Sequence, residues 1–253
     1  MSTISFIIPL IIASAIPLAI VALGALFSER SGVVNIALEG IMLMGAFVGA
    51  VVMKQLEPTE ISTQLIVFIG LGVGAIIGMI FSLLHAFAAV NMKANQIISA
   101  TALNMFAPAF AIFVNRTFSG GGTQRVLLTR TDYKISSIPG LGDLGFIGEW
   151  FFQNAYLSTY VGIVVFIVAT IILYKTKWGL RLRSCGENPQ AADSLGINIY
   201  KIRYAGTLIS GAMAGMGGVI FLVSFATEFN ANVAGFGFLA LAVLISGQWK
   251  PGR

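Results

Sequence analysis

Long apolar stretches separated by short polar segments dominate the chain. The seven apolar windows cover residues 4–27, 33–53, 64–90, 94–115, 155–174, 202–226 and 233–249. A membrane-spanning helix needs about 20 apolar residues, because each residue advances the helix by about 1.5 Å. Lipid offers no hydrogen-bond partner to an open strand edge, so each span must be helical. The pattern predicts an all-α, polytopic membrane helix bundle of about seven spans, forming one transmembrane domain over residues 1–253.

The composition excludes an ordinary soluble protein. Hydrophobic residues make up 57% of the chain and charged residues 10%, against about 25% charged residues in a typical soluble domain. Mean hydropathy is +0.90. The single cysteine, Cys185, excludes an internal disulfide. The net charge of +5 does not indicate nucleic acid as a partner, because the basic residues follow the ends of the apolar windows.

The distribution of lysine and arginine predicts the orientation. With the loop 175–201 in the cytoplasm and the loop 116–154 outside, ten basic residues lie inside and five outside, and the N-terminus is extracellular. The inner set is Arg30, Lys93, Lys175, Lys177, Arg181, Arg183, Lys201, Arg203, Lys250 and Arg253. The outer set is Lys54, Arg116, Arg125, Arg130 and Lys134.

Small residues recur one helical turn apart in three windows. The pairs Gly45–Gly49, Gly74–Gly78 and Gly211–Gly215 each form a Gly-x-x-x-Gly pattern. Such pairs let helix backbones approach closely inside a membrane. The pattern is typical of a tightly packed bundle.

Polar residues inside the windows are candidates for a solute path, because each costs free energy at membrane depth. Glu39 is the one acidic residue within a window, and Asn35 precedes it by one turn on the same predicted helical face. Asn104 lies in the middle of the fourth window, which Asn95 and Gln96 open. Glu39 either lines the path or is a buried carboxylate bonded to a neighbouring helix. Asparagine both donates and accepts hydrogen bonds, which favours hydroxylated or amide-bearing solutes over ions.

The chain lacks the residues that covalent chemistry needs. His85 is the only histidine, which excludes a multi-histidine metal site, and a structural role facing another helix is expected for it. No Gly-x-x-x-x-Gly-Lys-Ser/Thr phosphate loop occurs. Neither a metal nor a cofactor is expected, and any ATP must be bound by another polypeptide. A secondary transporter driven by an ion gradient is a rival interpretation, but it would be expected to carry more acidic residues or histidines within the membrane.

The cytoplasmic loop contains a short helix with both ends marked. Asn188 is a natural N-cap, Pro189 suits the first helical position, and Gly196 suits the end. A surface helix of small residues can dock into a groove on a partner, although an ordinary capped connector has the same pattern. The candidate docking residues are Gly186, Glu187, Asn188, Pro189, Ala191, Ala192 and Gly196.

Three separate motifs resemble one family of permeases. Residues 179–198 (GLRLRSCGENPQAADSLGIN) with 209–215 (ISGAMAG) resemble ABC importer permeases for ribose-type sugars, branched-chain amino acids and nucleosides. Residues 28–40 (SERSGVVNIALEG), and the segments GFGFLALA at 235–242 and GQWKP at 247–251, look like the nucleoside or simple-sugar branch. The motifs occur in the family's order and cover nearly the whole chain.

The resemblance implies a type II-like permease in the plasma membrane of a bacterial cell, carrying a nucleoside or a related simple sugar. The helix around residues 187–196 would couple to a cytoplasmic ATP-binding subunit, and the span with Asn35 and Glu39 would lie near the solute path. The implied partners are a solute-binding protein, often a lipoprotein, and a second related permease. Family members continue with roughly two further spans, so the chain is expected to be truncated after Arg253. A ribose-type sugar or a branched-chain amino acid remains an alternative solute.

Overall fold

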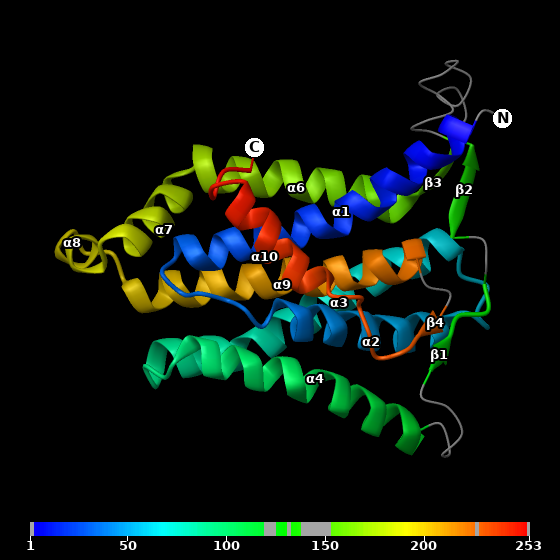
Figure 1. The fold of residues 1–253 in the computed structure, drawn as a ribbon, viewed down its shortest axis with the longest axis horizontal. Helices are drawn as coiled ribbons and strands as arrows, with labels where there is room; N and C mark the ends of the chain where they lie inside the picture. The colour runs from blue at the N-terminus through cyan, green and yellow to red at the C-terminus, as the bar shows by residue number, and fades with distance from the viewer. Residues whose placement is uncertain (1–2, 119–124, 131–132, 138–152, 226–227, 252–253) are drawn as a thin grey trace.

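The computed structural model describes residues 3–118, 125–130, 133–137, 153–225 and 228–251. Within these ranges, six helices are long and apolar enough to cross a membrane, which confirms the predicted helical membrane protein. They are α1 (Thr3–Arg30), α2 (Leu38–Leu56), α3 (Thr63–Ala86, extended by the π-helical turn η1, Phe87–Asn91), α4 (Gln96–Phe118), α6 (Leu157–Lys175) and α9 (Ile199–Phe225). Figure 1 shows them side by side along the long axis of the molecule.

The seventh apolar window holds a helix that is shorter than predicted. Only α10 (Phe236–Ser246) is helical in that window, and its 11 residues extend about 16 Å, roughly half of the hydrocarbon thickness. The chain reaches α10 through irregular backbone that leads inward from the strand β4 (Glu228–Phe229), as Figure 1 shows. The second window is also irregular at its start, because α2 begins only at Leu38. Hydropathy does not reveal where irregular backbone finds partners inside the protein.

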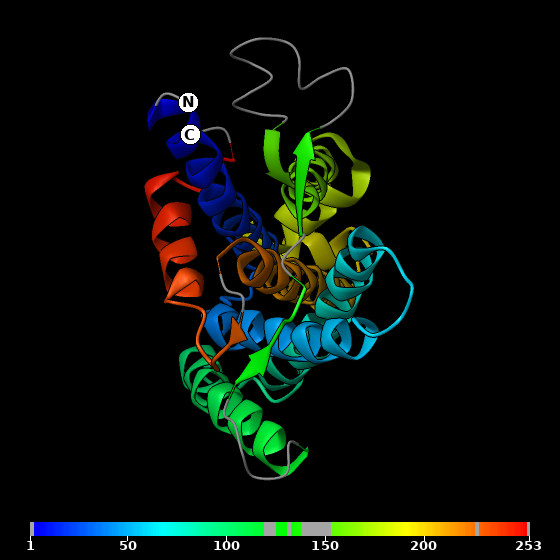
Figure 2. The same cartoon turned by 90° about the vertical axis from the view of Figure 1, so that its right-hand side faces the viewer.

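Helix α9 is the centre of the bundle. Of the residues in the most apolar stretch of α9, 72% are buried, whereas the share is 17% in α4 and 28% in α6. Figure 2 places α9 in the middle, with α1, α2 and α3 around it and α4 at the edge. The outward faces of α4 and α6 are therefore left for lipid or another chain.

The predicted glycine pairs bring α2, α3 and α9 into contact. A Cβ atom added at Gly215 would overlap the carbonyl oxygen of Gly74, and one added at Gly45 would overlap the Cα atom of Gly215. Gly78 meets the carbonyl oxygen of Gly211 in the same way. The backbones of these helices thus touch directly, as the spacing of small residues predicted.

The two ends of the bundle differ. At one end are the start of α1 and short antiparallel strand pairs, β1 (Val126–Leu127) with β4 and β2 (Lys134–Ser137) with β3 (Gln153–Tyr156). At the other end are α7 (Lys177–Glu187) and α8 (Pro189–Ser194), together with the end of α1 and the start of α9 (Figure 1). This second end carries most residues of the predicted inner set. Residues 119–124, 131–132 and 138–152 of the predicted outer loop lie outside the described residues.

Hydrogen bonds of Glu57 and Arg130 connect the elements at the strand-bearing end. The carboxylate of Glu57 accepts hydrogen bonds from the N–H and hydroxyl of Thr129, the N–H of Arg130 and the hydroxyl of Tyr133. The guanidinium of Arg130 donates to the carbonyl oxygens of Glu57 (2.7 Å) and Ile61 (2.9 Å). Burial alone raises the pKa of Glu57, but the hydrogen bonds outweigh it and hold the pKa below its ordinary value. Glu57 therefore stays ionised and ties the β1 region to the turn between α2 and α3.

The glycine contacts yield a direct test of the packing. Replacing Gly215 by alanine should lower the free energy of unfolding by about 1–3 kcal/mol, the usual cost of overpacking a tight interface. Gly72→Ala is the matched control, because a Cβ atom added there would meet no atom within 4 Å beyond its own neighbours and helix backbone. We expect a lower thermal midpoint in mild detergent for the Gly215 variant and an unchanged or higher midpoint for the Gly72 variant. Equal midpoints would contradict the close contact of α9 with α3.

Candidate functional site

Two irregular segments connect elements of the helix bundle. Residues 33–37 connect the turn after α1 to α2, and residues 230–235 connect β4 to α10. Backbone N–H and C=O groups at membrane depth cannot bond to water and must find partners in the protein. The side chains that supply these partners define the polar site.

The first segment is held by side chains from α3 and α4. The side-chain oxygen of Gln96 accepts a hydrogen bond from the N–H of Val34 at 2.8 Å. Nε2 of His85 lies 3.0 Å from the carbonyl oxygen of Val34, and Nδ1 lies 3.2 Å from the hydroxyl of Ser99. Because a carbonyl oxygen only accepts, Nε2 carries a proton. The predicted structural role of His85 is confirmed.

Asn104 of α4 bridges the irregular segment and the first turn of α2. Its Nδ2 donates to the carbonyl oxygen of Ile36 at 2.9 Å, and its Oδ1 accepts from the N–H of Gly40 at 2.8 Å. A Cβ atom at Gly40 would lie 3.0 Å from Oδ1 of Asn104, so glycine permits this approach. One side chain thus satisfies a carbonyl before the helix and an amide within it.

Asn35 is buried between the segment and α9. Its side chain is fully inaccessible, with Nδ2 donating to the hydroxyl of Ser210 at 3.1 Å and Oδ1 accepting from the N–H of Ala37 at 3.1 Å. The prediction that Asn35 shares a helical face with Glu39 is wrong, because α2 begins after it. The hydrogen bond from the N–H of Ala37 to the side chain of Asn35 stabilises a local turn that competes with helix formation.

Glu39 joins the two irregular segments. Its Oε1 accepts from the N–H of Gly235 at 3.0 Å and its Oε2 from the N–H of Gly237 at 2.7 Å. Gly235 has φ +76°, a left-handed conformation that glycine adopts without strain. Glu39 lies in the first turn of α2 and next to the first turn of α10. It therefore also faces the positive ends of two helix dipoles.

Four of the five predicted path residues therefore gather around the start of α2. Asn95 does not join them: it is exposed, and its Oδ1 caps α4 by accepting from the N–H of Ile97 at 2.9 Å. The sequence analysis missed Ser99 and Ser210 as members of the site. Serines are common in membrane helices, so composition alone did not separate these two from the others.

The short capped helix that was predicted in the cytoplasmic loop is confirmed: it is α8, with Asn188 as its N-cap. Oδ1 of Asn188 accepts from the N–H of Ala191 at 3.0 Å, and Pro189 is at the first helical position. Gly196 follows the helix with φ +76°, and its N–H donates to the carbonyl oxygen of Asp193 at 2.8 Å. Ala191 is exposed, but the side chain of Ala192 is only 2% exposed and contacts its own chain. The interpretation that both alanines face a partner is therefore wrong for Ala192.

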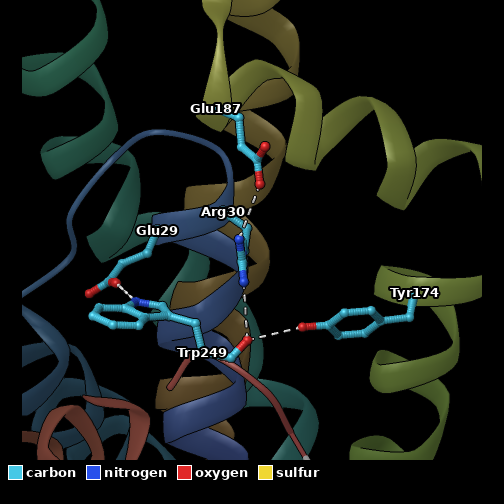
Figure 3. Close-up of polar contacts among 5 residues, drawn as sticks. All are labelled: Glu29, Arg30, Tyr174, Glu187 and Trp249. Atoms are coloured by element: carbon cyan, nitrogen blue, oxygen red, sulfur yellow. Dashed lines mark hydrogen bonds and ion pairs between the residues drawn. The ribbon is translucent and has the colours of Figure 1, made fainter. Parts of the chain in front are cut away.

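Figure 3 shows how the segment after α10 connects this end of the molecule. The carbonyl oxygen of Trp249 accepts from Arg30 at 3.3 Å and from the hydroxyl of Tyr174 at 3.1 Å, and its indole N–H donates to Glu29. Arg30 also lies 3.5 Å from the carboxylate of Glu187, the last residue of α7. A polar cavity of about 290 Å³ lies among these groups. Trp249 thus links α1, α6 and α10, and Arg30 extends the link to α7.

The contacts of Glu39 predict how the start of α10 depends on it. In Glu39→Ala, two backbone N–H groups lose their acceptor, each at a cost of about 1–3 kcal/mol. We expect the amides of residues 235–240 to exchange with deuterium on the order of tenfold faster or more, because local opening costs less. Ser210→Ala is the control, since it removes a bond to Asn35 and leaves α10 untouched. Unchanged exchange in the Glu39 variant would contradict the anchoring role.

Comparison with known proteins identifies the family. Residues 7–252 match the family model described as "Branched-chain amino acid transport system / permease component". The chain is 40% identical over 251 residues to a nucleoside ABC transporter permease protein, NupC, of Lactococcus lactis, covering 99% of this chain and 78% of the relative. It is 41% identical to a guanosine ABC transporter permease protein, NupQ, of Bacillus subtilis, covering 98% and 76%.

A more distant relative broadens the range of solute names. The chain is 32% identical to a putative glucose ABC transporter permease protein, TsgC13, of Haloferax volcanii, covering 95% of this chain and 70% of the relative. No solved structure matches the chain. Permeases of this kind are multi-pass proteins of the cell membrane that work with an ATPase and a solute-binding protein and do not themselves catalyse a reaction. The family model and the six long apolar helices agree, and the chain belongs to this family of ABC transporter permease components.

Proposed function

We propose that the chain is the permease subunit of an importer that carries nucleosides into the cell with ATP hydrolysed by a separate subunit. The observation that supports this most strongly is the similarity, over nearly the whole chain, to two permeases named for nucleoside and guanosine transport.

We place the solute path beside the two irregular segments. Irregular backbone at membrane depth occurs where it is buried in protein or lines a cavity, and discontinuous helices commonly form transport sites. In this proposal Asn35, Glu39 and Asn104 set the shape of the path wall, because their polar atoms bond to backbone groups. Gln96 does the same for Val34. These side chains position the segments, and solute contacts come from the surfaces that they shape.

The α7–α8 region is the proposed contact with the ATPase. Movement of this region would reach Arg30 through Glu187, then Trp249, and then α10, whose other end bonds to Glu39. This route supports a coupling role because an ion pair begins it, a hydrogen bond to Glu39 ends it, and a short helix lies between them. Coupling of this kind biases two states of the bundle from a distant site.

Two further partners complete the proposed importer. The weakly buried faces of α4 and α6 leave room for a second, related permease. The end that bears the β-strands, on the predicted extracellular side, would receive a solute-binding lipoprotein.

Mild-detergent purification of the native complex would reveal all of these subunits by mass spectrometry, whereas a stable complex of this chain without an ATPase would contradict the assembly.

Uptake measurements test the solute. Cells lacking their own nucleoside uptake, and given this permease together with the second permease, the ATPase and the binding protein, should accumulate labelled guanosine. Excess unlabelled nucleosides should compete, and leucine or ribose should not. Uptake should also persist after the proton gradient is collapsed, since ATP supplies the energy. Competition by leucine or ribose alone would overturn the nucleoside assignment, and loss of uptake with the gradient would favour an ion-coupled mechanism.

A bulky residue on the exposed face of α8 tests the coupling. Ala191→Trp adds volume at the proposed contact, and we expect uptake to fall about tenfold or more, as tight interfaces lose about 1–3 kcal/mol on overpacking. Membrane insertion and the thermal midpoint should not change, because Ala191 is exposed. Ala94→Trp is the control, an exposed alanine between α3 and α4 on the same side of the bundle. Normal uptake by the Ala191 variant, measured with ATPase activity, would refute the docking role of α8.

A further inference from the structure

A second cavity of about 210 Å³ lies at the same end of the molecule, away from Trp249. It is bounded by the end of α3 with η1, the first turn of α9 and the start of α8. Ala89 and Val90 line it on the apolar side, and Lys93, Tyr200 and Arg203 line it on the polar side. Among the described residues that line it, none is acidic. The cavity therefore carries two positive charges without a neutralising carboxylate.

Neither cation has an ion pair within the part of the chain that the structure describes. Nε of Arg203 is buried and has no hydrogen-bond partner there. Its guanidinium lies beside Gly32, since a Cβ atom added at Gly32 would be 3.2 Å from Nη2 and 3.5 Å from Nε. A guanidinium that lacks a carboxylate partner can still donate its remaining N–H groups to an anion in charge-assisted hydrogen bonds.

The surroundings place the cavity at the boundary between hydrocarbon and water. Leu84 and Phe87, nine and six residues before Lys93, expose 54% and 52% of their surfaces on an apolar helix. Tyr200 is 57% exposed beside the cavity, and tyrosines are enriched at this level of the membrane. The first turn of α9, which borders the cavity, adds the partial positive charge of a helix N-terminus.

We propose that this cavity binds the phosphate of an anionic phospholipid in the cytoplasmic leaflet, with Lys93 and Arg203 as its ligands. Basic pockets between membrane helices on the cytoplasmic side recognise such headgroups. The exposed apolar face of α3 leads away from the cavity in the direction that acyl chains would take. The inference does not depend on the solute, and it uses the predicted orientation of the chain. It also places a lipid next to Pro189, at the base of α8.

Lipid binding to the intact transporter complex tests this site. The probe is phosphatidylglycerol in nanodiscs of phosphatidylcholine, with bound lipid counted by native mass spectrometry. In Lys93→Gln/Arg203→Gln, we expect one fewer tightly held phosphatidylglycerol and affinity for it weakened about tenfold or more, since each basic residue near the surface contributes on the order of a fivefold effect. Lys177→Gln/Lys201→Gln removes the same charge from exposed positions outside the cavity and should retain the lipid.

Further arms separate the other occupants. Arg203→Lys keeps the charge and should keep the lipid, and matching thermal midpoints show that the variants are folded. Inorganic phosphate added to complexes in phosphatidylcholine alone should not raise the midpoint as phosphatidylglycerol does. Equal stabilisation by inorganic phosphate would make this a site for free anions and overturn the lipid proposal. Loss of the ATPase subunit in the double variant, with phosphatidylglycerol retained, would also overturn it, because an acidic side chain of that subunit would then be the ligand.

Discussion

The need to satisfy backbone hydrogen bonds away from water determines the centre of this molecule. Residues 33–37 and 230–235 are irregular, so their backbone groups lack the hydrogen bonds of a helix, and lipid cannot replace them. Asn104, Gln96 and His85 supply the partners for one stretch, and Glu39 supplies them for the other. Each of these side chains is costly at membrane depth by itself. Together with the backbone they form a network in which each group offsets the cost of another.

The glycine-mediated contact of α9 with α2 and α3 gives that network a firm support. Ser210, which bonds to Asn35, lies one residue before Gly211, whose backbone touches Gly78. The polar site is thus attached to the most deeply buried helix of the bundle. The helices at the edge, α4 and α6, are the least buried of the spanning helices, but α4 stays bonded to this network through Gln96 and Asn104.

Local signals in the sequence were reliable, and signals that depend on distant partners were not. The caps of α8 follow from Asn188, Pro189 and Gly196, since each acts on neighbours within three or four residues. Six of the seven apolar windows hold helices long enough to span a membrane. Hydropathy predicts them because a long run of apolar residues prefers lipid to water. The irregular start of the second window and the short α10 were not predictable in this way. Their hydrogen-bond partners are distant in the sequence: Asn104 bonds to Ile36, 68 residues away, and Glu39 bonds to Gly235, 196 residues away. No local pattern encodes such pairs.

The short helix α10 is bonded near both of its ends, to Glu39 at the first turn and, through Trp249, to α1 and α6 after the last. Inserting or deleting one residue between these points would turn one end relative to the other by about 100° and move it by about 1.5 Å. If the hydrogen bonds to Glu39 were kept, Trp249 would no longer reach α1 and α6, and the reverse also holds. Most surface loops accept changes in length, but this segment does not: its 11 residues act as a spacer of fixed length and fixed rotation.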